Sequence, residues 1–181
     1  MPSGPFAPDH DFAPAPAGAR VRIVTLLCFV ATVGMAVVIP TVARRQHHAS
    51  PWLAVVAVGV TTVVLVAVWF TARIRRYRLT AADLQVRLPL RTVRFPLAGL
   101  QTVTPDREAL RGARKIVGND GIGAISGRYR SKRLGRFHAY VTDCEHAVVL
   151  RWPDRGLVVS PDQTAWFVET VRRNAGLTPS R

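Results

Sequence analysis

The sequence predicts an α+β membrane protein in which a two-helix transmembrane hairpin precedes an antiparallel β domain with a C-terminal helix. Three observations lead to this prediction: two long uncharged segments near the N-terminus, period-two hydrophobic alternation after residue 78, and a helical pattern near the C-terminus. Charge divides the chain in the same way. Residues 1–72 hold four Lys or Arg and two acidic residues, whereas residues 73–181 hold 21 and nine. The length leaves room for one small domain and excludes a large enzyme.

Residues 23–43 and 52–72 are each 21 residues long and carry no charged side chain. A helix rises about 1.5 Å per residue and a bilayer core is about 30 Å thick, so each segment is long enough to span it. Neither segment has a polar face, and the rest of the chain is too short to bury two such helices. The expected membrane-interface anchors are Trp52, Trp69, Arg73, Arg75 and Arg76.

The short connection between the spans, residues 44–51, places both termini on one side of the membrane. Six arginines flank the spans on that side, and two, Arg44 and Arg45, lie in the connection. The positive-inside rule therefore predicts a multi-pass protein of the inner or plasma membrane with both termini cytoplasmic, although the two arginines in the connection favour the opposite orientation. Residues 1–20 are rich in Pro, Ala and Gly, which predicts a disordered N-terminal tail.

Residues 73–176 form the predicted β domain, and residues 177–181 form a second tail. Apolar side chains alternate over 84–90 and 93–97, and further short strands are expected at 101–104, 137–142, 147–152 and 157–160. This predicts six or seven short antiparallel strands. Ser160 and Pro161 are expected to begin the C-terminal helix through a capping box. Its apolar stripe is Trp166, Phe167, Thr170 and Val171, and Gly176 is expected to end it.

The order of these elements resembles a pleckstrin-homology (PH)-like fold, an antiparallel β-barrel or sandwich capped by a C-terminal helix. Four segments that carry the resemblance are Tyr77-Arg78-Leu79-Thr80, Gly118-Asn119-Asp120-Gly121-Ile122-Gly123, Phe137-His138-Ala139-Tyr140-Val141-Thr142-Asp143 and Val158-Val159-Ser160-Pro161-Asp162. Their order is similar to that of a bacterial PH domain family that often follows a pair of membrane spans. The similarity covers about residues 77–172. It implies a fold, and it implies no established activity.

A glycine-rich segment contains Gly118, Gly121, Gly123 and Gly127. A phosphate-binding loop would end in Gly-Lys-Ser/Thr, and a dinucleotide loop would have a shorter last interval, so nucleotide binding is not expected. Two interpretations remain open. The segment is an irregular hairpin loop whose glycines allow positive φ, or it approaches a ligand or the membrane, with Ile122 and Ile125 near its tip.

A basic cluster follows the glycine segment. The residues expected to contact a lipid or a protein partner are Arg128, Tyr129, Arg130, Lys132, Arg133 and Arg136. Each Lys or Arg near an anionic leaflet contributes about 1 kcal/mol of attraction, so a tethered basic domain is expected to lie against anionic headgroups of the lipid bilayer. Nucleic acid is not an expected partner, because the sequence contains no recognition helix, zinc-finger spacing or base-stacking platform.

Metal, cofactor and catalytic sites are not expected. The histidines and Cys144 lack further ligands at the spacing of a known metal site, and the acidic residues are dispersed along the chain. The sequence therefore predicts a non-enzymatic module that binds anionic headgroups or a protein partner. The alternative is a structural or scaffolding membrane protein that acts through another membrane protein or through self-association, without lipid specificity.

Overall fold

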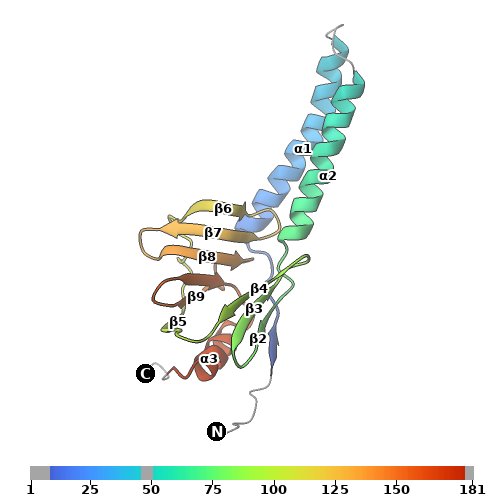
Figure 1. The fold of residues 1–181 in the computed structure, drawn as a ribbon. Coiled ribbons are helices and arrows are strands. Elements are labelled where there is room, and N and C mark those ends of the chain that lie inside the picture. Colours follow the sequence, from blue (N-terminus) through green and yellow to red (C-terminus); the bar gives the residue numbers. More distant parts are fainter. Residues whose placement is uncertain (1–8, 46–50, 178–181) are drawn as a thin grey trace.

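The computed structural model describes residues 9–45 and 51–177. Two long helices, α1 (Ala19–Arg45) and α2 (Pro51–Ala72), lie side by side and extend from one end of a β domain (Figure 1). Their segments Ala19–Ile39 and Val55–Ala72 are long and apolar enough to cross a membrane, and only 0% and 6% of them are buried inside the protein. These are the two candidate spans that the sequence predicts. Residues 46–50 of the predicted connection lie outside the described residues.

The β domain is a sandwich of two sheets and does not form a closed barrel. The first sheet has the order β1-β2-β3-β4 and the second has the order β5-β9-β10-β8-β7-β6. The strands of the first sheet are β1 (His10–Phe12), β2 (Arg76–Leu79), β3 (Asp83–Arg87) and β4 (Thr92–Pro96). Those of the second sheet are β5 (Thr102–Pro105), β6 (Arg114–Asp120), β7 (Ile125–Ser131), β8 (Gly135–Val141), β9 (Val148–Arg151) and β10 (Gly156–Val159).

The strand count and one strand direction differ from the prediction. The described residues form ten strands, and β10 runs parallel to β8. The parallel pair arises because β9 and β10 form an antiparallel hairpin whose second strand lies between β9 and β8. The sequence pattern identifies strands from alternation but carries no information about which neighbour each strand selects.

The prediction of a disordered tail over residues 1–20 is wrong for the part that the structure describes. β1 pairs antiparallel with β2 at the edge of the first sheet, and Pro14 bridges to Pro161. Phe12 is only 3% exposed, and its ring lies 5.0 Å from that of Phe167. A three-residue strand is too short to show alternation, and its stability comes from an edge that only the folded domain offers. Residues 1–8 of the predicted tail lie outside the described residues.

The second sheet is covered on both faces. One face packs against the first sheet and the C-terminal helix α3 (Thr164–Asn174), with Tyr77, Leu150 and Phe167 fully buried between them. Burial raises the pKa of Tyr77 to about 12. The opposite face packs against residues 109–110 and against Val21 in the first turn of α1. The base of the helical hairpin is therefore part of the core of the β domain.

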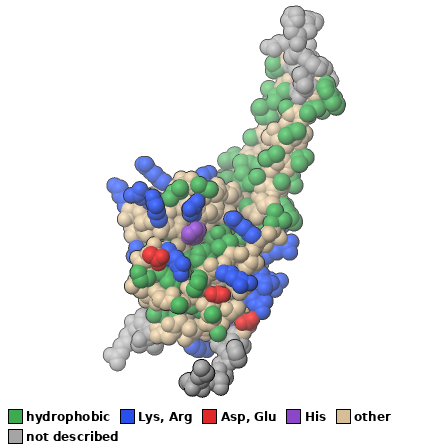
Figure 2. Space-filling view, viewed as in Figure 1, with side chains coloured by type: hydrophobic (Ala, Val, Ile, Leu, Met, Phe, Trp, Pro, Cys, Tyr) green, Lys and Arg blue, Asp and Glu red, His purple; other side chains and the backbone are tan. Residues whose placement is uncertain are grey.

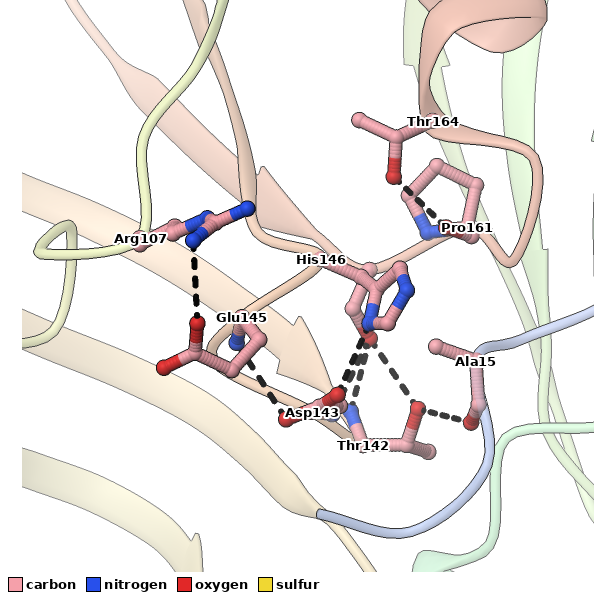
Figure 3. Close-up of polar contacts among 9 residues, drawn as sticks. Ala15, Arg107, Thr142, Asp143, Glu145, His146, Pro161 and Thr164 are labelled. Atoms are coloured by element: carbon pink, nitrogen blue, oxygen red, sulfur yellow. Dashed lines mark hydrogen bonds and ion pairs between the residues drawn. The ribbon is translucent and has the colours of Figure 1, made fainter.

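The predicted capping box at the start of α3 is not formed. The helix begins at Thr164, and its N-cap residue Gln163 makes no side-chain capping bond. Ser160 is fully buried instead, and its Oγ accepts the backbone N–H of Thr142 at 2.8 Å. Thr142 in turn donates to the carbonyl of Ala15 at 2.6 Å, so this polar cluster fastens the N-terminal segment to the sheet (Figure 3). Gly176, with φ +68°, lies just past the end of α3, as predicted.

Candidate functional site

The glycine segment folds into the β6–β7 hairpin. Gly118 and Gly127 face each other across the two strands, with φ of +138° and +137°. A Cβ built on Gly118 would lie 2.1 Å from the carbonyl oxygen of Ser126 and 2.7 Å from Cα of Gly127. The Asn119 side chain organises the following turn, and its Nδ2 donates to the carbonyl of Ala124 at 2.6 Å. The segment is thus a hairpin whose glycines have positive φ, as one of the two interpretations predicted, but it is compact and its two strands make close backbone contact.

The hairpin turn is docked on the base of the two helices (Figure 1). Thr25 Oγ1 donates to the carbonyl of Gly121 at 3.1 Å and accepts the N–H of Gly123 at 3.1 Å. A Cβ on Gly123 would lie 2.9 Å from the carbonyl oxygen of Trp69 in α2. Asp120 and Arg20 form an ion pair at 2.9 Å. The glycines therefore allow the β domain to approach both helices closely.

The tip of this hairpin does not project from the protein. Ile125 is 1% exposed and belongs to the core, and Ile122 is half-buried. Ile125 therefore does not form an exposed tip that could reach a ligand or the membrane, and the turn itself is in contact with α1 and α2.

The predicted basic cluster is divided between two strands and a turn. Arg128 and Arg130 on β7 lie on the same sheet face as Arg136 on β8, because Arg130 is opposite Arg136 in the register. Lys132 and Arg133 lie in the turn between these strands. The structure thus brings the five cations to one region of the second sheet.

Tyr129 does not belong to this basic surface. Its side chain points to the opposite face, where it is 2% exposed, and its hydroxyl donates to the carbonyl of Asn119 at 2.7 Å. Burial raises its pKa above the ordinary value. The prediction that Tyr129 contacts a lipid or a partner is wrong, because alternation along β7 places it in the core.

A basic concavity of about 910 Å³ opens beside the β7–β8 turn. The cations that line it are Arg111, Arg114, Arg130, Lys132 and Arg133. Two of them are neutralised, because Arg111 pairs with Glu108 at 2.6 Å and Arg133 pairs with Asp106. The other three form no ion pair with any described residue. The concavity therefore has a net positive charge suited to an anionic group.

The sequence analysis missed the exposed apolar residues of β6. Ile116 is 49% exposed and Val117 is 58% exposed, and they follow the cations Arg114 and Lys115. β6 is an edge strand, and a register shift between Lys115 and Val117 interrupts its pairing with β7. The signal that could have found this feature is the sequence of two cations followed by two β-branched apolar residues before a glycine.

β6 lies at the end of the domain from which the helices extend (Figure 1). Lys and Arg side chains outnumber acidic ones on the face of the domain shown in Figure 2, and several gather at this end. The β3–β4 turn belongs to the same end, because the N–H of Arg75, just after α2, donates to the carbonyl of Arg87 at 2.8 Å. That turn carries Leu90, which is 76% exposed. Cations and exposed apolar side chains thus occur together next to the candidate spans.

The predicted interface anchors occupy both ends of α2. Trp52 near its start is 69% exposed, whereas Trp69 near its end is half-buried against the glycine turn. The guanidinium of Arg73 lies 4.6 Å above the Trp69 ring. Arg75 and Arg76 are exposed, and Arg76 pairs with Asp11 at 2.9 Å. The two indoles are about 25 Å apart along the helix, which is close to a bilayer core thickness.

His138 is a titratable group that lies near arginines of the second sheet. It lies between the sheets, 5.8 Å from the Phe95 ring. Burial, followed by the positive charges of Arg128 and Arg155, lowers its pKa. Within residues 9–45 and 51–177, no three His, Cys, Asp or Glu side chains converge on a point that would hold a metal ion.

Comparison with protein families matches residues 75–175 to the model described as "Bacterial PH domain". The match covers more than half of the chain and the β domain from β2 to α3. Comparison with curated proteins found no match, and comparison with solved structures found none either. The two-sheet sandwich and its C-terminal helix agree with the family match, and the chain belongs to the bacterial PH domain family.

Proposed function

We propose that this protein is a non-catalytic binding module, anchored in the cell membrane by α1 and α2, whose β6 end contacts anionic lipid headgroups. PH domains are generally binding modules for lipids or proteins, so the family supports the broader part of the proposal. The observation that carries the lipid part is the β6 edge, where Arg114 and Lys115 adjoin the exposed Ile116 and Val117.

The position of this edge supports contact with the bilayer surface. β6 lies beside the base of the candidate spans, so insertion of α1 and α2 would hold it at the headgroup level. Each of its two cations would contribute about 1 kcal/mol of attraction to an anionic leaflet. Burial of Ile116 and Val117 in the interface would add to this, at about 25 cal/mol per Å² of apolar surface.

The arginines that flank the two candidate spans support a cytoplasmic location for the β domain. Arg20 and Arg22 precede the first span, and Arg73, Arg75 and Arg76 follow the second, all at the domain end of the hairpin. The positive-inside rule favours a cytoplasmic location for this end and for both termini, because these arginines outnumber Arg44 and Arg45 in the connection.

Hydrogen–deuterium exchange of the full-length protein in nanodiscs tests the proposal. The exchange of residues 114–118 is compared between phosphatidylcholine discs and discs that contain phosphatidylglycerol. We expect slower exchange over β6 in the anionic discs, and loss of this protection in Arg114→Gln/Lys115→Gln. The control Arg151→Gln/Arg173→Gln removes the same charge from β9 and α3, farther from the helices, and should keep the protection.

Salt distinguishes the electrostatic contact from a protein interface. Raising the ionic strength from 0.05 to 0.5 M should weaken β6 protection, because the Debye length shortens well below about 10 Å. Equal exchange in neutral and anionic discs, in a folded and inserted protein, would refute the lipid proposal. It would favour the scaffolding function in which β6 pairs with another protein.

A further inference from the structure

A groove of about 640 Å³ lies at the junction of the helices and the β domain. Its walls come from the first turns of α1, the last turn of α2, residues 14–17 of the N-terminal segment and the glycine turn. The side chains that matter here are Arg22, Leu26 and Phe29 from α1, Trp69 from the last turn of α2, and Arg73, which directly follows α2. The groove is distinct from the basic concavity beside the β7–β8 turn, with which it shares no lining residue.

The lining of the groove changes from charged to apolar along the helix axis. Arg22, Leu26 and Phe29 have the spacing i, i+4 and i+7, which places them on one face of α1. Phe29 lies about 10 Å farther from the domain than Arg22, at about 1.5 Å per residue. Trp69 lies in the last turn of α2, and Arg73 follows the end of that helix on the side of the domain. Both arginines are therefore at the domain end of the groove, and the apolar side chains extend from them into the candidate spans.

The charge of the groove is not balanced from within the protein. No Asp or Glu is among its lining residues. Arg22 and Arg73 form no ion pair with any residue of the described ranges, in contrast to Arg20, which pairs with Asp120. The Arg73 guanidinium is held over the Trp69 ring at 4.6 Å, which leaves its N–H groups available to an anion.

We propose that this groove binds one anionic glycerophospholipid. Its phosphate is held by Arg22 and Arg73, and the upper part of one acyl chain packs along Leu26, Phe29 and Trp69. The groove and the phospholipid match in the order of their polar and apolar parts. A phospholipid in the leaflet next to the domain has its phosphate on the domain side and its acyl chains toward the bilayer centre. Bound there, it contacts α1, α2 and the N-terminal segment together. The inference rests on the insertion of α1 and α2, which is part of the proposed function, and does not require the β6 contact.

Native mass spectrometry of the full-length protein in detergent tests this site. Delipidated protein is titrated with dioleoyl phosphatidylglycerol, and occupancy of the first lipid is compared with that of dioleoyl phosphatidylcholine. We expect a saturable 1:1 complex with phosphatidylglycerol. In Arg22→Gln/Arg73→Gln, the affinity should fall on the order of 10-fold or more, since two cations facing the phosphate are lost. The control Arg91→Gln/Arg94→Gln removes two exposed cations outside the groove and should bind like the unaltered protein.

Two further variants distinguish the groove site from the proposed β6 contact with the bilayer. Leu26→Ala/Phe29→Ala shortens the apolar wall and should also reduce the 1:1 complex, whereas Arg114→Gln/Lys115→Gln should not. Equal binding of the two lipids, or equal loss in the groove and control variants, would overturn the site. Resistance of each variant to carbonate extraction from membranes reports insertion separately. If the proposed function is wrong, the unaltered protein will lack insertion or the β6 protection in anionic discs. If only the groove proposal is wrong, insertion and β6 protection will be seen, but the 1:1 complex will show no preference for phosphatidylglycerol.

Discussion

The close approach of β6 and β7 makes a strong prediction about Gly118. Changing Gly118 to Ala adds a Cβ that would lie 2.1 Å from the Ser126 carbonyl oxygen and 2.7 Å from Cα of Gly127. Both obstacles are backbone atoms, so no side chain can rotate away. The φ of +138° is itself strained for alanine. Backbone strain costs about 1–3 kcal/mol and overpacking about 1–3 kcal/mol, so the variant should lose about 2–6 kcal/mol of stability.

Gly112 provides the matched control. It also has positive φ, at +67°, but a Cβ added there would meet nothing within 4 Å. Gly112→Ala should therefore cost only the left-handed backbone penalty, about 1–2 kcal/mol. The difference between the two variants reports the contact between the strands together with the different backbone strain at φ +138° and φ +67°.

Thermal unfolding of the full-length protein in detergent measures both variants. Near-UV circular dichroism follows aromatic packing in the β domain, where 1 kcal/mol lowers Tm by roughly 4 °C or more. We expect Tm to fall by about 8 °C or more for Gly118→Ala and by less for Gly112→Ala. A Tm for Gly118→Ala equal to or above that of the control would show that the hairpin tolerates a wider strand separation, and the argument from close backbone contact would be wrong.

Two further predictions concern buried polar groups. Tyr77→Phe removes a hydroxyl that donates to the Tyr140 carbonyl at 2.8 Å, and should lower the free energy of unfolding by about 1–3 kcal/mol in denaturant titrations, because a buried carbonyl loses its partner. An unchanged midpoint would contradict this. The pKa of His138 is lowered in the folded protein by burial and by Arg128 and Arg155, so the unfolded chain binds the proton more readily. The free energy of unfolding should therefore be insensitive to His138 above the ordinary histidine pKa of about 6.5, and it should fall as the pH drops below that value. Tm measured between pH 5 and 7.5 should show this slope, and His138→Gln should flatten it; an equal slope in the variant would assign the effect to other groups.

The sequence alone determined the two candidate spans and the family-level fold. An apolar segment of 21 residues is a local property that needs no partner to be recognised, because its length matches a bilayer. The strands from β3 to β5 and from β8 to β10 could also be predicted from local sequence, because alternation of apolar and polar residues indicates which face of a strand is buried. The end of α3 shortly before Gly176 could be predicted because glycine readily adopts positive φ.

Only the tertiary structure decided what each unusual segment contacts. The glycine turn is placed against Thr25 and Trp69, about 100 and 50 residues away in the chain, and no local pattern records that pairing. Ser160 is a residue type that often caps helices, but here the N-terminal segment packs beside it. The N–H of Ala15 donates to the Ser160 carbonyl at 2.8 Å, and Ser160 is buried. Tyr129 and the cations beside it are neighbours in sequence, and the pleat of β7 sends them to opposite faces. The two proposed lipid contacts, at β6 and in the groove between α1 and α2, likewise depend on residues that meet only after folding.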